Sequence, residues 1–207
     1  MKLKVCGMKY PENIEAVSAL KPDYLGFIFY EKSVRFFEER EINSSSEIQK
    51  VGVFVNENPE VMSHKIQKFN LDIIQLHGNE TPEISEKMKQ LNPNIKIWKA
   101  FSIGNDFDFE QLEKYQNVEA YLFETKGKNY GGNGVKFNWE ILKNYNSNKE
   151  IILSGGISVD DVPLIYELQK KIPQIQTIDV NSRFETGPGR KDVERLRVFY
   201  EKLKELR

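Results

Sequence analysis

The sequence predicts a single α/β domain folded as a (β/α)8 TIM barrel, and three observations support this. Short apolar runs alternate with longer amphipathic stretches about eight times along the chain, and strands that are each followed by a helix pair in parallel through crossovers. No Ser-, Pro- or Gly-rich linker divides residues 1–207. Polar residues follow the apolar runs directly, where a barrel places its functional groups. An open doubly wound sheet shows the same alternation, but the number of units favours the barrel.

The predicted strands are short apolar runs, and the one at 24–30 is apolar on both faces, as in a parallel sheet covered on both sides. In order, they lie at residues 2–8, 24–30, 50–55, 71–76, 96–101, 120–124, 151–153 and 177–180. The first helix is expected to begin near Pro11, because proline is favoured at the first helical position. Further helices are expected within 37–50, at 59–69, 82–91 and 109–115, from 139, and at 159–169 and 193–206.

The composition is that of an ordinary globular protein with balanced charge. Thirty basic and 31 acidic residues give a formal net charge of -1, so the sequence offers no reason to expect a nucleic-acid or membrane partner. No stretch approaches the roughly 18 apolar residues of a membrane span, and the N-terminus shows no hydrophobic signal core. With one cysteine in the chain, the cytoplasm is the expected location.

That single cysteine, Cys6, stands at the end of the first predicted strand. It has no second cysteine with which to form an internal disulfide or a thiolate metal site. Free cysteine is among the most buried residue types, so one interpretation is that Cys6 fills space in the core. The alternative is that the acid–base chemistry of its thiol is used. Its place at the carboxyl end of a barrel strand favours the second interpretation.

Other polar residues also lie where the predicted strands end. In chain order these are Arg35, Asn56, Gln75, His77, Glu124, Ser154, Gly155, Gly156, Asp179, Asn181 and Ser182. Because the carboxyl ends of all eight strands open at one face of a barrel, we expect these residues to surround one site. Cys6 and Glu124 would then project from opposite sides of the mouth as a possible acid–base pair.

Two glycine-rich segments are candidates for binding phosphate. Gly155 and Gly156 precede a predicted helix and bring bare backbone amides close together, and Asn181 and Ser182 follow the next strand. Barrels frequently bind phosphate between units seven and eight, so we predict a phosphate site there. Residues 131–134 hold three glycines and suit a flexible lid, a second phosphate-binding backbone or a solvent-exposed loop.

Two basic side chains remain open to more than one interpretation. His77 is expected to be a hydrogen-bonded structural residue or a substrate contact, because the only other histidine, His64, falls in a predicted helix and a two-histidine metal site is not expected. Arg35 is either a solvated surface charge or a ligand for a substrate carboxylate, which its planar guanidinium fits.

A set of motifs, in fixed order, connects the chain to a known family. They are Lys4-Val5-Cys6-Gly7-Met8, Gly26-Phe27-Ile28-Phe29-Tyr30 with Lys32-Ser33-Val34-Arg35, Val51-Gly52-Val53-Phe54-Val55-Asn56, Gln75-Leu76-His77-Gly78, Lys99-Ala100-Phe101, Tyr130-Gly131-Gly132-Asn133-Gly134, Phe137-Asn138-Trp139, Leu153-Ser154-Gly155-Gly156-Ile157, Asp179-Val180-Asn181-Ser182-Arg183-Phe184-Glu185 and Pro188-Gly189-Arg190-Lys191-Asp192. With them the chain resembles, essentially end to end, the phosphoribosylanthranilate isomerases of tryptophan biosynthesis.

This resemblance implies an Amadori rearrangement of N-(5-phosphoribosyl)anthranilate, a small phosphorylated substrate, with neither a metal nor an organic cofactor. A general acid protonates the furanose ring oxygen and opens the ring to a Schiff base, and a general base then removes the proton at C2. Cys6 matches the family's base and Glu124 its acid, while Arg35 matches the residue that holds the anthranilate carboxylate. Gln75, His77 and Asp179 are expected to contact the substrate. The backbones at Gly155–Gly156 and Asn181–Ser182 match the phosphate site.

One position departs from the family pattern. The family's acid is usually an aspartate, whereas Glu124 is one methylene longer, and catalytic geometry is sensitive at about the 1 Å scale. The alternatives are a histidine-pathway aminoaldose isomerase, which typically carries aspartate at the position of Cys6 and is longer, and a catalytically inactive phosphate-binding barrel. The sequence is compatible with a monomer or a homodimer.

Overall fold

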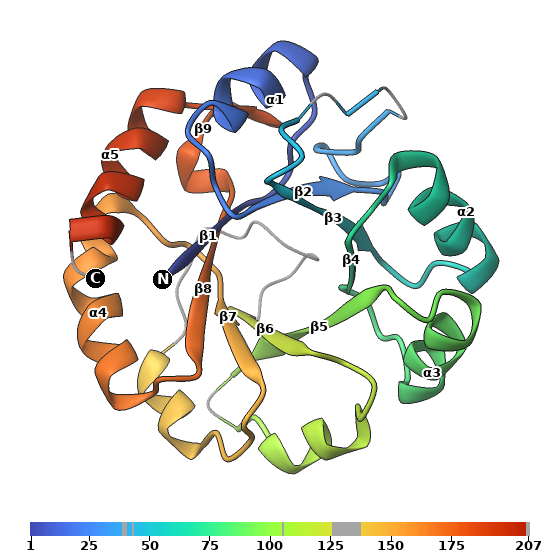
Figure 1. The fold of residues 1–207 in the computed structure, drawn as a ribbon. Helices are drawn as coiled ribbons and strands as arrows, with labels where there is room; N and C mark the ends of the chain where they lie inside the picture. The colour runs from blue at the N-terminus through green and yellow to red at the C-terminus, as the bar shows by residue number, and fades with distance from the viewer. Residues whose placement is uncertain (39–40, 43, 105, 126–137, 206–207) are drawn as a thin grey trace.

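The computed structural model describes residues 1–38, 41–42, 44–104, 106–125 and 138–205, and it forms the predicted barrel. Eight parallel strands close in chain order, with the first strand paired to the last (Figure 1). The strands are β1 (Lys2–Val5), β2 (Tyr24–Ile28), β3 (Gln49–Phe54), β4 (Ile73–Leu76), β5 (Lys96–Ile103), β6 (Ala120–Thr125), β7 (Glu150–Leu153) and β8 (Ile175–Val180).

Helices surround the barrel as an outer ring (Figure 1). They are α1 (Pro11–Ser18), α2 (Pro59–Phe69), α3 (Pro82–Leu91), α4 (Val162–Lys171) and α5 (Val193–Glu205), with the 3-10 segments η1 (Phe109–Lys114), η2 (Trp139–Asn144), η3 (Val159–Asp161) and η4 (Ser182–Phe184). Proline begins α1, α2 and α3, where its missing N–H costs no helical hydrogen bond.

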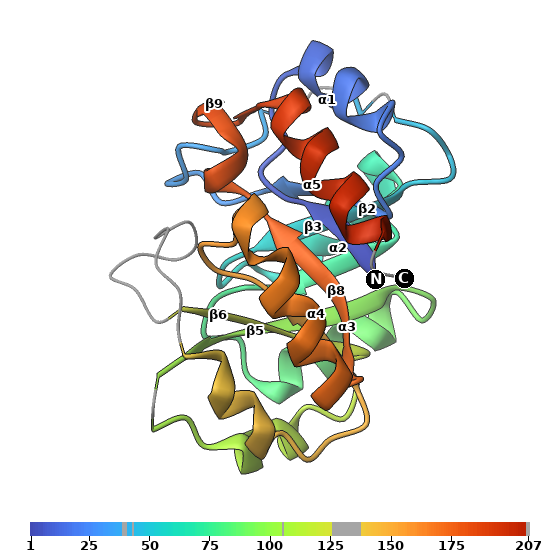
Figure 2. The same ribbon diagram turned by 90° about the vertical axis from the view of Figure 1, so that its left-hand side faces the viewer.

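The structure differs from the sequence predictions in three places. The helix expected within 37–50 is absent from the described residues of that range, where short polar side chains such as Ser44 and Ser45 compete for backbone hydrogen bonds. The units after β5 and β6 carry 3-10 segments in place of full α-helices. An unexpected hairpin of β9 (Glu185–Gly187) and β10 (Arg190–Lys191) follows β8 and lies toward the end where the strands finish (Figure 2). The glycines at 131–134 lie outside the described residues.

The alternation of side chains along each strand divides the core into two parts. A large outer cluster packs the strands against the helices. A separate inner cluster fills the barrel and consists of Tyr24, Val51, Ile73, Trp98, Ala100, Ala120, Leu122 and Ile152. Toward the carboxyl ends of the strands, polar side chains such as Lys4, Gln75, Glu124 and Asp179 are buried as well. The interior of the barrel is therefore filled by apolar side chains, and buried polar side chains lie near the carboxyl ends of the strands. No described helix is long and apolar enough to cross a membrane.

Candidate active site

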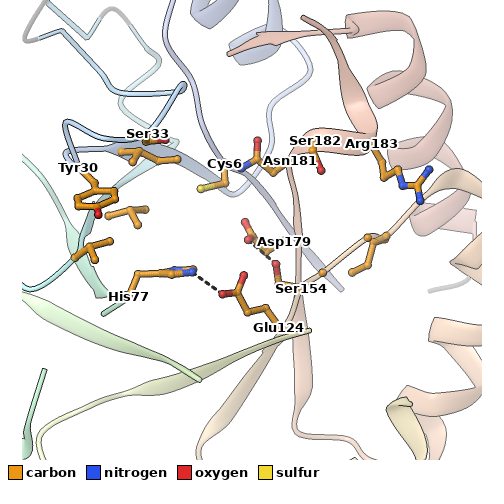
Figure 3. A pocket seen from close by; sticks show the side chains of 16 residues that line it. Cys6, Tyr30, Ser33, His77, Glu124, Ser154, Asp179, Asn181, Ser182 and Arg183 are labelled. Carbon is orange, nitrogen blue, oxygen red and sulfur yellow. Dashed lines mark hydrogen bonds and ion pairs between the residues drawn. The ribbon is translucent and has the colours of Figure 1, made fainter. Parts of the chain in front are cut away.

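A pocket, partly open to solvent, lies at the carboxyl ends of the strands (Figure 3). The predicted site residues that line it are Cys6, His77, Glu124, Ser154, Gly155, Gly156, Asp179, Asn181 and Ser182. Arg35, Asn56 and Gln75 are not among the lining residues. Figure 3 shows Cys6 and Glu124 on opposite walls, as expected from the order of the strands.

Cys6 is held at the top of β1, one residue beyond its last strand position. Its backbone N–H donates to the Val180 carbonyl oxygen at 2.9 Å, so the pairing of β1 with β8 continues to Cys6. Its thiol is free, and the residue is only 5% exposed. On the neighbouring strand β2, a Cβ added at Gly26 would lie 2.9 Å from the Cys6 Sγ atom. Gly26 therefore makes the space that the thiol occupies.

A fully buried ion pair lies one layer below the thiol. Lys4 and Asp179 are register partners across the β1–β8 closure, and the Lys4 Nζ atom donates to the Asp179 Oδ1 atom at 2.8 Å. The Ser154 hydroxyl donates to the Asp179 Oδ2 atom at 3.0 Å. Burial lowers the pKa of Lys4, but Asp179 and Cys6 more than offset this, and the net pKa lies above its usual value. Lys4 is therefore a permanent cation beneath Cys6.

The pKa of the Cys6 thiol reflects opposing influences. Burial raises it, the Lys4 ammonium group lowers it, Asp179 raises it and Lys191 lowers it. The net pKa lies above the ordinary value, so without a ligand the sulfur retains its proton at neutral pH. The two lysines are the groups that stabilise the thiolate, the form in which Cys6 acts as a base.

A second buried cluster joins the hairpin to the loop after β2. The Lys191 Nζ atom donates to the Asn181 Oδ1 atom and to the Glu185 Oε1 atom, each at 2.6 Å. Glu185 also accepts from Arg35, at 2.9 Å from Nε to Oε1 and 2.7 Å from Nη2 to Oε2. Arg35 is thus clamped by a carboxylate of the protein through two of its three nitrogens. Burial lowers the pKa of Lys191, and Glu185 opposes that shift.

The opposite wall carries a chain of hydrogen bonds that ends at Glu124. Gln75 is fully buried in β4, one layer below His77, and its Nε2 atom lies 2.5 Å from the His77 Nδ1 atom. The His77 Nε2 atom lies 2.9 Å from the Glu124 Oε1 atom (Figure 3). Gln75 is therefore placed to act on the pocket through His77.

The predicted phosphate segments meet at one end of the cavity. Gly155 and Gly156 have φ of 92° and 66°, a left-handed conformation that glycine adopts without strain. A Cβ at Gly155 would lie 2.8 Å from the Thr125 Oγ1 atom, so a larger residue would push the turn out of place. Asn181 and Ser182 line the same cavity from the end of β8. Backbone amides from two neighbouring units therefore border one space.

Three residues of the site escaped the sequence analysis: Lys4, Glu185 and Lys191. Lys4 could have been found, because it precedes Cys6 by two positions on a strand and so shares its face. Glu185 and Lys191 reach the site through a hairpin that the sequence pattern did not predict. In the described part of the chain, no group of three or more His, Cys, Asp or Glu side chains is arranged to hold a metal ion.

Comparison with known proteins agrees with this geometry. Residues 3–202 match the family of N-(5'phosphoribosyl)anthranilate (PRA) isomerase. An N-(5'-phosphoribosyl)anthranilate isomerase from Parabacteroides distasonis is 40% identical over 98% of this chain and 93% of its own length. One from Phocaeicola vulgatus is also 40% identical, over 99% of this chain and 98% of its own.

Solved structures show the same fold from end to end. The phosphoribosyl anthranilate isomerase of Thermus thermophilus superposes with a TM-score of 0.87 at 27% identity, over 100% of both chains. Another isomerase, in complex with reduced 1-(o-carboxyphenylamino)-1-deoxyribulose 5-phosphate, superposes with a TM-score of 0.81 at 26% identity, over 99% of both chains. By sequence along nearly its whole length and by structure, the chain belongs to the phosphoribosylanthranilate isomerase family.

Proposed function

We propose that the cavity converts N-(5-phosphoribosyl)anthranilate to 1-(2-carboxyphenylamino)-1-deoxyribulose 5-phosphate, with Cys6 as general base and Glu124 as general acid. The observation that carries this assignment is that the Cys6 thiol and the Glu124 carboxyl face each other across a pocket bordered by glycine backbone. The solved relative that binds the reduced product supports the choice of substrate. The reaction belongs to tryptophan biosynthesis.

The reaction then follows from where each proton moves. Glu124 gives its proton to the furanose ring oxygen, the bond from that oxygen to C1 breaks, and the nitrogen lone pair forms the C1=N bond of a Schiff base. The Cys6 thiolate takes the proton from C2, and the electrons of that bond give the enolamine. Gain of a proton at C1 and loss of one from the C2 hydroxyl produce the ketone. The substrate lies between the two walls, so acid and base act on opposite sides of the sugar.

The surrounding charges support this division of roles. Lys4 and Lys191 lower the pKa of Cys6 and so stabilise the thiolate against the effect of burial. We assign the substrate phosphate to the backbones at Gly155–Gly156 and Asn181–Ser182. Arg35 is assigned to the anthranilate carboxylate, for which Nη1 and the second hydrogen of Nη2 remain beside the bonds to Glu185.

The remaining predictions concern contacts and partners. His77 and Asp179 line the cavity, which supports substrate contacts for both. A structure of monomers generated from the dimeric isomerase of Thermotoga maritima superposes with a TM-score of 0.80 at 28% identity over 99% of both chains. A monomer or a homodimer stays a prediction for this chain, as does its location in the cytoplasm.

A fluorescence assay tests the function directly. Purified protein mixed with phosphoribosylanthranilate should remove the fluorescence of that substrate. Cys6→Ala should abolish turnover and still bind the reduced product, as measured by calorimetry. Activity that survives Cys6→Ala contradicts the assignment of the base. Turnover of the histidine-pathway aminoaldose in its place would favour that isomerase, and loss of neither substrate would leave an inactive phosphate-binding barrel.

A further inference from the structure

The hydrogen-bond chain from Gln75 to Glu124 contains two groups that the reaction scheme above does not use. Gln75 has no exposed surface, and its Oε1 atom is buried with no hydrogen-bond partner among the described residues. Buried polar atoms are normally paired, because an unpaired one loses its bonds to water without replacement. Either orientation of the amide leaves one of its two polar groups in this unpaired position, so burial does not fix which of the two faces His77.

The arrangement in the structure fixes one tautomer of His77. The Gln75 Nε2 atom is a donor, so the His77 Nδ1 atom beside it accepts and carries no hydrogen. In a neutral imidazole the hydrogen then lies on Nε2, which donates to the Glu124 Oε1 atom. In this state Glu124 accepts the hydrogen bond at Oε1, and the bond does not require the carboxyl to hold a proton.

A half-turn of the Gln75 amide reverses the direction of every bond in the chain. The Oε1 atom then faces His77 and accepts from Nδ1–H, which leaves Nε2 as an acceptor. The bond between Nε2 and Glu124 is kept only if Glu124 holds a proton and donates it. The same atoms at the same separations thus define two states, and only the second requires a proton on Glu124, where it is ready for the ring oxygen.

We propose that Gln75 and His77 are positioning residues that set the proton on Glu124, with the orientation of the Gln75 amide selecting the His77 tautomer. This inference rests on the proposed function, in which Glu124 is the acid. Because the proposed acid must hold a proton when the substrate arrives, we assign to the resting enzyme the acid-ready state, with hydrogen on Nδ1 and the Gln75 amide turned from its orientation in the structure.

The place of the pair in the molecule fits this role. His77 and Glu124 line the active-site cavity, and they also line a second cavity on the side of β5. The hydrogen bond between His77 and Glu124 therefore lies in the wall between the two cavities. Gln75 lines neither cavity and reaches Glu124 only through His77. The glutamine acts on the direction of the bond without touching the substrate.

Nitrogen NMR tests the tautomer independently of turnover. The chain has two histidines, and His64 is exposed on α2, so a His64→Gln background with ¹⁵N-labelled histidine leaves the signals of His77 alone. We expect a pyrrole-type signal from Nδ1 and a pyridine-type signal from Nε2. Gln75→Met removes the amide and should average the two signals. Gln75→Asn, whose amide is one carbon shorter, should give the same result and serves if the methionine variant does not fold.

Kinetics supply the second readout. General acids contribute about 10²- to 10⁴-fold to rate. In the Gln75 variants Glu124 should hold its proton for only part of the time, so we expect kcat to fall by about 10- to 100-fold while KM stays within about twofold. Gln169→Met is the matched control, because the Gln169 amide donates to the Ile175 carbonyl oxygen away from the site. It should change neither the His77 signals nor kcat.

The outcomes separate this inference from the function on which it rests. Unchanged His77 signals in both Gln75 variants would overturn the tautomer assignment, and so would a resting state with its hydrogen on Nε2. Altered signals with a normal kcat would overturn the effect on Glu124. Normal turnover by Glu124→Gln would instead remove Glu124 as the acid, whatever the His77 signals show.

Discussion

The two walls of the cavity are built from different kinds of groups. Beside Cys6 lie charged pairs, Lys4 with Asp179 and Lys191 with Glu185, all buried. Glu124 is bonded instead to His77, behind which lies the amide of Gln75. A base is needed as an anion, which fixed cations stabilise. An acid must hold a proton until it is used, and groups that both donate and accept allow this. The wall around Cys6 is therefore suited to a group that takes a proton from the substrate, and the wall around Glu124 to a group that gives one.

The largest effect should come from removing the cation beneath the base. Lys4→Met leaves Asp179 buried without its partner, which we expect to cost about 3–5 kcal/mol of unfolding free energy. It should also raise the pKa of Cys6 further, since Lys4 lowers it. Each unit of that rise lowers the thiolate fraction about tenfold at neutral pH, and turnover with it. Urea unfolding and the pH dependence of iodoacetamide alkylation measure the two effects.

A second buried lysine provides the control for Lys4. Lys99 is 2% exposed and bonds to the Glu80 Oε2 atom at 3.2 Å, away from Cys6. Lys99→Met should destabilise the fold while leaving the alkylation profile of the thiol in place. If Lys4→Met and Lys99→Met give the same profile, the charge beneath Cys6 has no special role, and the contrast between the walls fails.

An intermediate effect should follow from giving Glu124 the length that is usual in the family. Glu124→Asp withdraws the carboxyl by one methylene from the His77 Nε2 atom, now at 2.9 Å. Because misplacement by about 1 Å costs up to about 10²-fold, we expect kcat to fall by 10- to 100-fold with little change in KM. Glu124→Gln has no acidic proton, so its kcat gives the lowest value expected in the same assay. A kcat at or above that of the parent enzyme would show that this wall is not matched to glutamate.

The smallest effect concerns Glu185 and appears in the pH dependence of stability. Burial raises the pKa of Glu185, but Arg35 and Lys191 outweigh burial and bring it below its usual value. Its contribution is therefore complete above the unfolded pKa of about 4.3 and is lost as the pH falls through the folded pKa. Glu185→Gln should destabilise the fold at pH 7 by about 1.5–3 kcal/mol. Urea unfolding from pH 7 to pH 3 should show that difference narrowing, and a constant difference would contradict it.

The strands were the most predictable part of the fold. Apolar runs such as those at 24–30 and 50–55 are short and are bounded by polar residues, so the local sequence alone indicates a strand. The helix expected within 37–50 is absent from the described residues of that range, because polar residues such as Ser44 and Ser45 interrupt any continuous apolar face and compete for backbone hydrogen bonds. The β9–β10 hairpin is too short to show a strand pattern, and contacts with the barrel hold it in place.

The site was predictable as a set of strand ends, but its pairings were not. Cys6, His77 and Glu124 follow apolar runs, so one rule of barrel architecture brings them together. Which charge meets which depends on register. Lys4 meets Asp179 only because β1 pairs with β8 at one particular offset, and no local pattern encodes that offset.

The pairing of the first strand with the last also bears on synthesis of the protein. Cys6 emerges early from the ribosome, whereas Asp179, Glu185 and Lys191 belong to the final segment. Contacts so distant in sequence form late, because the loop that joins them must be closed first. During translation the thiol therefore lacks Asp179 and Lys191, two of the groups that act on its pKa. The pKa that the Cys6 thiol has in the folded protein is therefore reached only when these late contacts form. In an incomplete chain the thiol has the pKa of an ordinary cysteine.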